Sequence, residues 1–351
     1  MERKIQPEEI RAALISQSGD IYNMGDVIRF LCQKNLYKHV GARFLCWMIM
    51  INKLPPNRSF WVSKLYEMYQ NYIEIREKNL NDLSISPLYL IPADARRVIS
   101  GDLRRTYVWF CKLAEQVGIQ EYYLNGAQIR AERILTFIYL ENPNYSYTQG
   151  NDRFVWVSFL VCLFFASHGG LNCSFAEALS FYLAEFFIMH NKVAKNLQNL
   201  PYLQHRFSKM DSLLSIEEPE VFQYLNQSQH FALQYGMKWE LTFFSDEHNA
   251  HELMLIWDNI LARFDHYGKF LQCLAVAHIK QVPIPSHPDE MAMTIQQYKN
   301  WNVSKIISDA IEMMDYEEDN SQQYCKCYGR CINFMGHLFG CYKKRNSSLQ
   351  W

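Results

Sequence analysis

Apolar side chains recur at intervals of three and four residues along most of this chain. From residue 59 to residue 78, this spacing places Trp61, Tyr69 and Ile73 on one side, which predicts an amphipathic helix. No segment shows the sustained alternation of apolar and polar residues that a half-buried strand needs. The pattern therefore predicts an all-α fold.

The same periodicity, interrupted by prolines, glycines and polar turns, predicts further helices. Residues 8–34 are expected to form one or two helices, and residues 93–118 to form short helical segments. The longest apolar run, Phe154–Ala166, is shorter than the about 20 residues that cross a bilayer, so we expect a buried core helix there. Other predicted helices cover residues 40–50, 131–140, 175–188, 203–215, 218–225, 253–263 and 270–279.

Composition agrees with long helices and narrows the range of functions. Glycine (14) and proline (11) are scarce, and hydrophobic residues make up 49% of the 351 positions, enough for a substantial core. Lysine and arginine (35) nearly balance aspartate and glutamate (36), so no overall positive field would hold a nucleic-acid backbone. The polar stretch after Met1 differs from a secretory signal. We therefore expect a cytoplasmic protein with ten reduced cysteines that does not bind nucleic acid.

Sequence signatures of common active sites are missing. No phosphate-binding glycine loop, dinucleotide fingerprint or serine nucleophile elbow occurs in the sequence. His248, His251 and Glu252 are close together, but their order is not that of a helix-borne zinc hydrolase. Ser245 and the acidic residue that follows it are expected to begin the next helix as its cap and first turn. The sequence thus predicts neither a metal site nor a self-contained active site.

Short clusters of distinctive residues do occur in a fixed order. Each one alone is weak, because the Ile-x-x-Asp-x-x-Arg spacing also occurs between Ile91 and Arg97. Taken singly, Arg105 is expected to pair with Asp102 three residues earlier on a helix, and Gln149 to bond the backbone of a turn. The clusters are Arg43-Phe-Leu-Cys-Trp47, Ile99-Ser-Gly-Asp102-Leu-Arg-Arg105-Thr106, Tyr147-Thr-Gln149-Gly150, a segment beginning at Trp239, and Ile256-Trp257-Asp258.

Together and in this order, the clusters resemble the TBC domain of Rab GTPase-activating proteins. That family carries Arg-x-x-x-Trp, then Ile-x-x-Asp-x-x-Arg-Thr, then Tyr-x-Gln-Gly, then Ile-Trp-Asp. The resemblance covers residues 36–284, and Arg105 matches better than Arg97 because Thr106 follows it. Arg105 and Gln149 are 44 positions apart, which indicates an insertion around residues 112–130. The insertion and the Asp-x-Arg-Arg element are also similar to one human member of the family.

The resemblance implies a multi-helix TBC fold and an enzyme activator rather than an enzyme. It implies that Arg105 and Gln149 act as two fingers in the active site of a GTP-bound Rab-family GTPase, in the regulation of vesicle trafficking. Asp102, Thr106, Tyr147 and Gly150 would support the fingers. No cofactor is expected, because GTP and Mg²⁺ would belong to the partner. The residues expected to form the scaffold are Ile99, Arg43, Trp47, Trp239, Trp257 and Asp258.

One departure from the family pattern leaves an alternative open. The family reads Tyr-x-Gln-Gly-Met-Asn, whereas Gly150 is followed here by Asn151 and Asp152. The first change removes an apolar anchor, and the second adds a negative charge near the expected position of the nucleotide triphosphate. The alternative function is therefore a TBC scaffold that binds a Rab or another trafficking partner without accelerating hydrolysis.

The expected organisation divides the chain into four parts. Residues 1–35 form a helical extension, 36–284 the TBC domain, 285–315 a further helical segment, and 316–351 an acidic linker with a cysteine-rich, basic tail. The tail cysteines lack the spacing typical of structural zinc sites. The tail is expected either to form an ordinary helix on the domain or, through reversible palmitoylation, to contact an endomembrane peripherally. Its cysteines are Cys325, Cys327, Cys331 and Cys341, and Lys343-Lys344-Arg345 follow.

Overall fold

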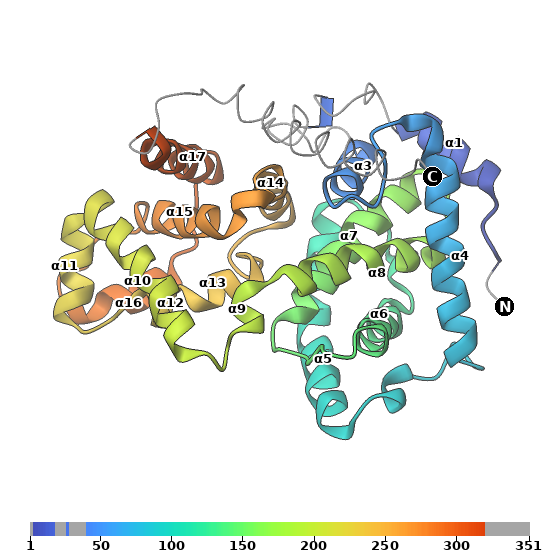
Figure 1. The fold of residues 1–351 in the computed structure, drawn as a ribbon, viewed down its shortest axis with the longest axis horizontal. Coiled ribbons are helices and arrows are strands. Elements are labelled where there is room, and N and C mark those ends of the chain that lie inside the picture. The colour runs from blue at the N-terminus through green and yellow to red at the C-terminus, as the bar shows by residue number, and fades with distance from the viewer. Residues whose placement is uncertain (1–2, 18–25, 28–39, 320–351) are drawn as a thin grey trace, which may run out of the picture.

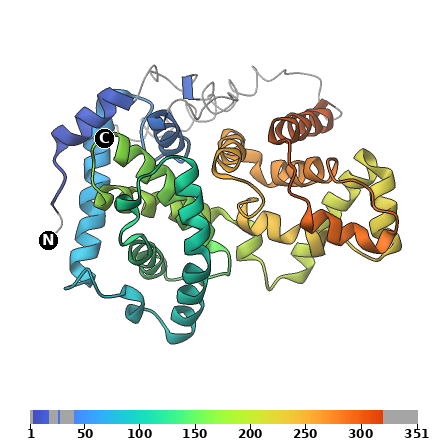
Figure 2. The same ribbon diagram turned by 180° about the vertical axis from the view of Figure 1, so that it is seen from behind.

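The computed structural model describes residues 3–17, 26–27 and 40–319, and every regular element in these ranges is helical (Figure 1). The predicted all-α class is confirmed. The helices form two lobes that lie side by side, and Figure 2 shows the same two lobes from behind. No described helix is both long enough and apolar enough to cross a membrane.

The first lobe contains the helices up to residue 190. At its centre, α7 is buried along nearly its whole length, as expected for a helix that is apolar on all sides. It packs against α8 and is covered by α3, α5 and α6. The elements of this lobe are α1 (Pro7–Gln17), α3 (Val40–Met50), α4 (Trp61–Asn79), α5 (Ala93–Gln116), α6 (Ala127–Glu141), α7 (Asn151–His168) and α8 (Cys173–His190), with 3-10 turns at Arg58–Phe60, Pro87–Leu90 and Glu121–Leu124.

The second lobe contains shorter helices and α17, the last helix of the described residues, which packs along α15. Here α13 and α14 contact the first lobe at α7, α3 and α5. The elements are α9 (Lys192–Lys195), α10 (Leu200–Glu217), α11 (Pro219–Gln227), α12 (Ala232–Tyr235), α13 (Met237–Thr242), α14 (Ala250–Ala262), α15 (Tyr267–Ile279), α16 (Met291–Gln297) and α17 (Val303–Asp319), with 3-10 turns at Phe264–His266 and Pro288–Glu290.

A single buried carboxylate ties three helices of the first lobe together. Glu177 of α8 accepts hydrogen bonds from Arg130 and Arg133 of α6 and from the Tyr72 hydroxyl of α4, each at 2.7 Å. Burial alone would raise the pKa of Glu177, but the two guanidinium groups hold it below its usual value. Glu177 is therefore an ionised anchor inside the lobe.

The two lobes are joined by a second buried charge pair. Arg43 of α3 donates from Nε and Nη2 to Asp258 of α14 at 3.1–3.2 Å, and the two side chains are 3% and 0% exposed. Trp47 donates to the same carboxylate at 2.6 Å and stacks on Trp257, with ring centroids 5.8 Å apart. The carboxylate is thus bonded to both side chains that reach it from the first lobe.

Two local predictions are wrong. Residues 93–118 hold one continuous helix, α5, rather than short segments, because Ile99, Leu103 and Phe110 keep one buried face despite the glycine and polar residues between them. Ser245 does not begin α14. Instead Asn249 accepts from the amide of Glu252 at 3.0 Å, and the Glu252 carboxylate accepts from the amide of Asn249 at 3.2 Å, which completes a capping box.

Ser245 cannot serve as the cap because the chain turns before it. Phe243 and Phe244 both adopt left-handed backbone conformations at the end of α13, with φ of 49° and 61°, and Ser245 is fully buried behind them. The indole of Trp257 fixes this turn by donating to the Phe243 carbonyl at 3.0 Å. Two consecutive bulky residues in this region are uncommon, so sequence alone gave no sign of the turn. The cysteine-rich tail lies outside the described residues.

We expect Asp258→Ala to lower the free energy of unfolding by about 3–5 kcal/mol, because it leaves the buried Arg43 guanidinium without its counter-charge. Glu67→Ala is the control, since Glu67 pairs with Lys64 on an exposed face of α4. That substitution is expected to cost less than about 1 kcal/mol. Urea denaturation of the two variants measures both. A loss at Asp258 no larger than that at Glu67 would show that the pair does not hold the lobes together.

Candidate functional site

Arg105 lies on the outer side of α5 and is held there by Asp102, one turn earlier on the same helix. The Arg105 guanidinium donates from Nη2 to Oδ1 of Asp102. The arginine side chain is 64% exposed, whereas the aspartate side chain is 3% exposed. The helix therefore presents an exposed cation that is anchored to a buried anion.

Asp102 also bonds the segment that carries Gln149. Its second carboxylate oxygen, Oδ2, accepts from the Tyr147 hydroxyl at 2.9 Å. Its backbone carbonyl accepts from the Thr106 hydroxyl at 2.9 Å, and Trp156 of α7 donates to that hydroxyl at 2.8 Å. One aspartate thus fixes Arg105 on one side and the 142–150 segment on the other.

Gln149 is exposed at the tip of a tight turn between α6 and α7. The Asn151 amide donates to the Thr148 carbonyl at 3.0 Å, which closes the turn. Gly150 has φ of 101° and ψ of −15°, close to the third position of a type II turn, where glycine is required. A Cβ atom on Gly150 would lie 3.2 Å from Cγ2 of Thr242 in α13, so the turn also touches the second lobe.

The two residues that depart from the family pattern both point inward. Asn151 is buried and donates to the Tyr145 hydroxyl at 3.0 Å. Asp152 is 2% exposed, and its Oδ1 lies 3.3 Å from the Tyr147 hydroxyl. The carboxyl group that the sequence led us to expect beside the nucleotide therefore lies in the interior, whereas the Gln149 side chain is exposed.

Burial raises the pKa values of two neighbouring side chains, Tyr147 and Asp152. The pKa of Tyr147 is raised well above its usual value, first by burial and then by Asp152 and Asp102, so the phenol keeps its proton. Burial also raises the pKa of Asp152, against the opposing effects of Arg153 and the Thr106 hydroxyl. Thr106 gives its hydrogen to the Asp102 carbonyl, and Oδ2 of Asp152 has no hydrogen-bond partner in the described structure.

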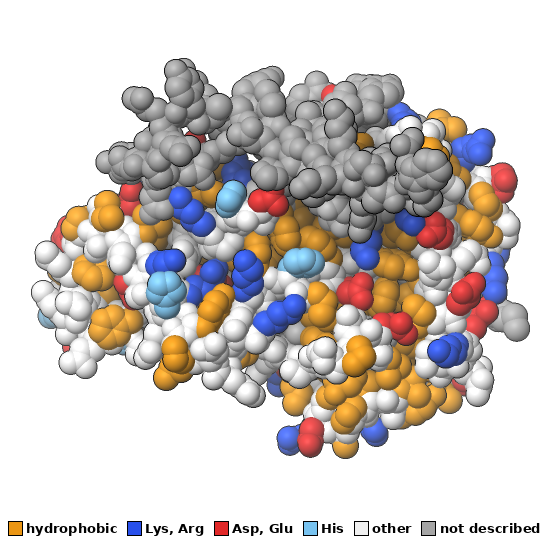
Figure 3. Space-filling view, in the orientation of Figure 1, with side chains coloured by type: hydrophobic (Ala, Val, Ile, Leu, Met, Phe, Trp, Pro, Cys, Tyr) orange, Lys and Arg blue, Asp and Glu red, His pale blue; other side chains and the backbone are white. Residues whose placement is uncertain are grey.

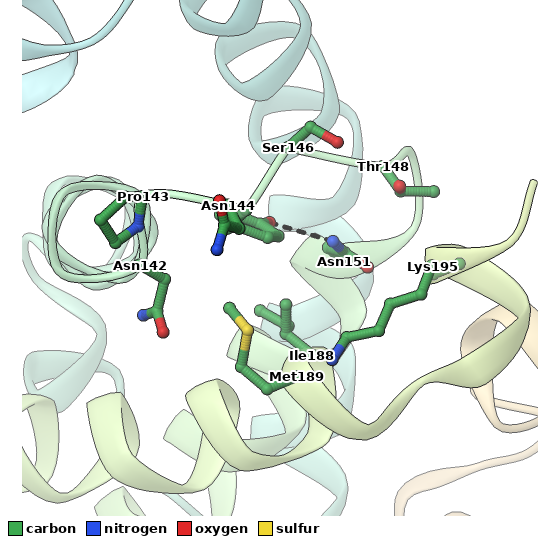
Figure 4. Close-up of a pocket in the computed structure, with 11 residues that line it drawn as sticks. Asn142, Pro143, Asn144, Ser146, Thr148, Asn151, Ile188, Met189 and Lys195 are labelled. Atoms are coloured by element: carbon green, nitrogen blue, oxygen red, sulfur yellow. Dashed lines mark hydrogen bonds between the residues drawn. The ribbon is translucent and has the colours of Figure 1, made fainter.

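A cavity of about 450 Å³ lies behind the segment that carries Gln149 (Figure 4). Its other side is formed by the end of α8, at Ile188 and Met189, and by α9, whose Lys195 side chain extends into it in the view. Asn151 lines the cavity at the position where the family has methionine. On this side the turn therefore borders open space, next to the Tyr145 ring that packs against Tyr139.

Arg153 is close to the site but is committed to other partners. Its guanidinium pairs with Asp246 of the second lobe at 2.7 Å and lies over the Trp109 ring at 4.3 Å. Arg97 is exposed on α5 like Arg105, but Asp94, the acid at the corresponding position before it, is exposed rather than buried. Arg105 is thus distinguished from Arg97 by its buried anchor.

The structure separates the predicted residues into two groups. Arg105, Asp102, Thr106, Tyr147, Gln149 and Gly150 come together where α5 meets the start of α7. Ile99 is fully buried on the inner face of α5. Trp239 stacks on Phe244 in the second lobe, with ring centroids 5.5 Å apart. Arg43, Trp47, Trp257 and Asp258 belong to the junction of the lobes.

Two further residues that help to position the turn, Tyr145 and Thr242, are not among those predicted from the sequence. Tyr145 receives the Asn151 amide, and Thr242 limits the room at Gly150. Tyr145 lies two positions before the Tyr147-Thr-Gln149-Gly150 cluster and so could have been noticed. No sequence signal connects Thr242 with a turn 92 positions earlier.

Basic side chains adjoin the site on the side of the second lobe. Figure 3 shows lysine, arginine and histidine side chains gathered on this face over α9, α10 and α13. Lys192 and Lys195 belong to α9, Lys209 to α10 and Lys238 to α13. In the described part of the chain, no three His, Cys, Asp or Glu side chains converge as a metal site requires. Lys238 within this surface is paired with Asp246 and Glu247.

Comparison with known proteins gives two findings. The family model of the Rab-GTPase-TBC domain matches residues 41–283. The crystal structure of the Ypt/Rab-GAP domain of Gyp1p superposes on this chain with a TM-score of 0.61, covering 88% of this chain and 98% of that domain at 14% identity. No curated protein is significantly similar in sequence. The structural likeness shows the same fold.

We expect Gly150→Ala to destabilise the protein by about 1–3 kcal/mol, because alanine is strained at this φ and its Cβ meets Thr242. Chemical denaturation measures the loss. Thr242→Ser removes the opposing methyl group while keeping the hydroxyl that donates to the Lys238 carbonyl. The double variant is expected to recover part of the loss, and strictly additive effects would show that the contact with the second lobe is unimportant.

Proposed function

This chain belongs to the Rab-GTPase-TBC domain family, and we propose that it accelerates GTP hydrolysis by a Rab-family GTPase with Arg105 and Gln149 as its two fingers. The observation that supports the proposal most strongly is the hydrogen bonding of Asp102. Its carboxylate bonds the exposed arginine with one oxygen and the Gln149-bearing segment with the other. The Arg105 side chain and the segment that carries Gln149 are thus anchored to the same buried group.

The chemistry requires positive charge and an aligned water molecule. Negative charge spreads over the phosphoryl group during GTP hydrolysis, and an arginine supplied in trans can be worth 10³–10⁵ in rate, or about 4–7 kcal/mol. Arginine suits this role because its guanidinium has five N–H donors and does not lose its proton. The bond to Asp102 engages Nη2, so donors remain for a phosphate while the side chain stays anchored.

Gln149 would orient the attacking water. Its amide offers both a donor and an acceptor, so it can bond the water and the GTPase backbone at the same time. The turn supports this role because it exposes Gln149 at its tip while Tyr147 and Asn151 face inward. GTP and Mg²⁺ would be held by the partner, and this chain would supply no cofactor.

The second candidate function is a scaffold that binds a Rab or trafficking partner without accelerating hydrolysis. Asn151 and Asp152 suggested it, because a charge beside the nucleotide would oppose catalysis. Their burial supports the activator instead, since neither side chain shares the exposed side of Gln149. We therefore place the activator first, acting in vesicle trafficking.

For the tail we propose peripheral contact with an endomembrane. The argument rests on sequence alone: four cysteines lie in an apolar, aromatic stretch and Lys343-Lys344-Arg345 follow them. Each basic residue near an anionic leaflet adds about 1 kcal/mol of attraction.

The finger residues are tested by GTP hydrolysis across a panel of purified, GTP-loaded Rab proteins. We expect the chain to accelerate one or a few of them, and Arg105→Ala to reduce that acceleration by about 10³-fold or more. Gln149→Ala is expected to abolish most of it as well, because the water loses its orienting group. Arg97→Ala is the matched control on the same face of α5 and is expected to retain wild-type acceleration.

Each other outcome has a definite meaning. If Arg97→Ala lost activity and Arg105→Ala kept it, the arginine finger would be Arg97 and not Arg105. Binding of a Rab without acceleration would establish the scaffold.

The tail proposal is tested by labelling cells with a palmitate analogue. We expect label on the wild-type chain and none after the four tail cysteines are replaced by serine, because the thioester needs a cysteine. An unlabelled wild-type chain contradicts the proposal.

A further inference from the structure

Two buried carboxylates converge on one hydroxyl group beside the proposed fingers. The Tyr147 oxygen lies 2.9 Å from Oδ2 of Asp102 and 3.3 Å from Oδ1 of Asp152. Both aspartates are 2% exposed. This phenol has a single hydrogen to give, and the Thr106 hydroxyl, which also lies by both aspartates, gives its hydrogen to the Asp102 backbone carbonyl.

The hydrogens at this point can be counted. If both aspartates were ionised, the Tyr147 hydrogen could satisfy one of them, and Asp152 would be a buried anion with Oδ2 unpartnered in the described structure. If Asp152 carries a proton on Oδ1, it donates to the Tyr147 oxygen, and Tyr147 donates to Asp102. One negative charge on Asp102 then faces one positive charge on Arg105.

We propose that Asp152 is a positioning residue that holds a proton and donates it as a hydrogen bond to Tyr147, and that this bond keeps Gln149 in place relative to Arg105. The proposal deepens the proposed activator function and rests on it. Asparagine, the family residue at this position, would donate the same bond permanently. In this chain the bond exists only while the carboxyl group is protonated.

The charged groups around Asp152 come from each element packed against it. From α5, Asp102 disfavours its ionisation and Thr106 favours it. From the segment before α7, Tyr147 contacts it and Tyr145 lies near. Within α7, Arg153 favours ionisation, but that guanidinium is bound to Asp246 of the second lobe. Burial outweighs these opposing effects.

Loss of the proton has a direct mechanical consequence. Asp152 releases it to water and becomes a second anion against Asp102, and the Tyr147 oxygen loses its donor. On its other side, the segment borders the cavity, which leaves room for it to move (Figure 4). The segment is then free to shift, and Gln149, two residues beyond Tyr147, shifts with it. Acceleration of hydrolysis is therefore expected to fall as pH rises through the pKa of Asp152.

The test compares Asp152→Asn with the wild-type chain on a responsive Rab, between about pH 5 and about pH 8.5. Taking the ratio of the two rates removes the pH dependence of the Rab itself. We expect this ratio, variant over wild type, to rise at least about threefold with pH, because the asparagine amide donates at every pH. Glu67→Gln is the control. It removes an exposed carboxylate of α4 that pairs with Lys64, and its ratio to wild type is expected to stay level.

A second readout does not need a Rab. Above the ordinary carboxyl pKa the unfolded chain ionises at residue 152 while the folded protein keeps the proton, so rising pH favours unfolding until the raised folded pKa is passed. Thermal unfolding should show Asp152→Asn gaining stability over wild type across this range and holding a constant advantage above it.

The two readouts separate the possible failures. A level stability difference would show that Asp152 is ionised throughout, and the proposal would be overturned. A rising stability difference with a level rate ratio would show a buried proton that does not position Gln149, which also overturns it. If no Rab is accelerated at any pH, the proposed function itself fails, whatever the unfolding curves show.

Discussion

The arrangement of the two lobes depends on one charge pair that water does not reach. Arg43 and Asp258 are taken out of solvent at a large desolvation cost, which is offset only because Trp47 completes the hydrogen bonding of the carboxylate. Such a pair tolerates little displacement, so it fixes α14 against α3. The contacts of α13 with α7, and of Thr242 with the turn at Gly150, follow from that placement.

A buried carboxylate paired with an arginine occurs again in the proposed site. Asp102 is buried like Asp258, but the arginine that it binds is exposed. Asp102 therefore orients a side chain on the surface. A buried anion with an exposed cation orders a long side chain that would otherwise lose entropy on meeting a partner. The arginine is thus partly oriented before any GTPase arrives. Glu177 is the contrasting case, because it pairs with two buried arginines and only holds helices of the first lobe together.

Much of the fold was predictable because helical periodicity follows directly from burial. The helix at 40–50 and the buried helix around Phe154–Ala166 were read from apolar spacing alone. The continuous α5 was not, since Gly101 and its polar neighbours weaken the pattern that tertiary packing restores. Within the site, the spacing of Asp102 and Arg105 on a helix predicted their contact. The link from Asp102 to Tyr147 spans 45 positions and arises from packing, which no local pattern encodes.

Both proposed fingers belong to the first lobe, because α5 and the turn before α7 are parts of one packed unit. The second lobe adjoins them through α13 and supplies much of the neighbouring basic surface (Figure 3). The proposed fingers and this basic surface therefore lie in different lobes of the molecule. Because the two lobes are separate packed units, the surface of the second lobe can diverge during evolution while the spacing of the two proposed fingers is inherited intact.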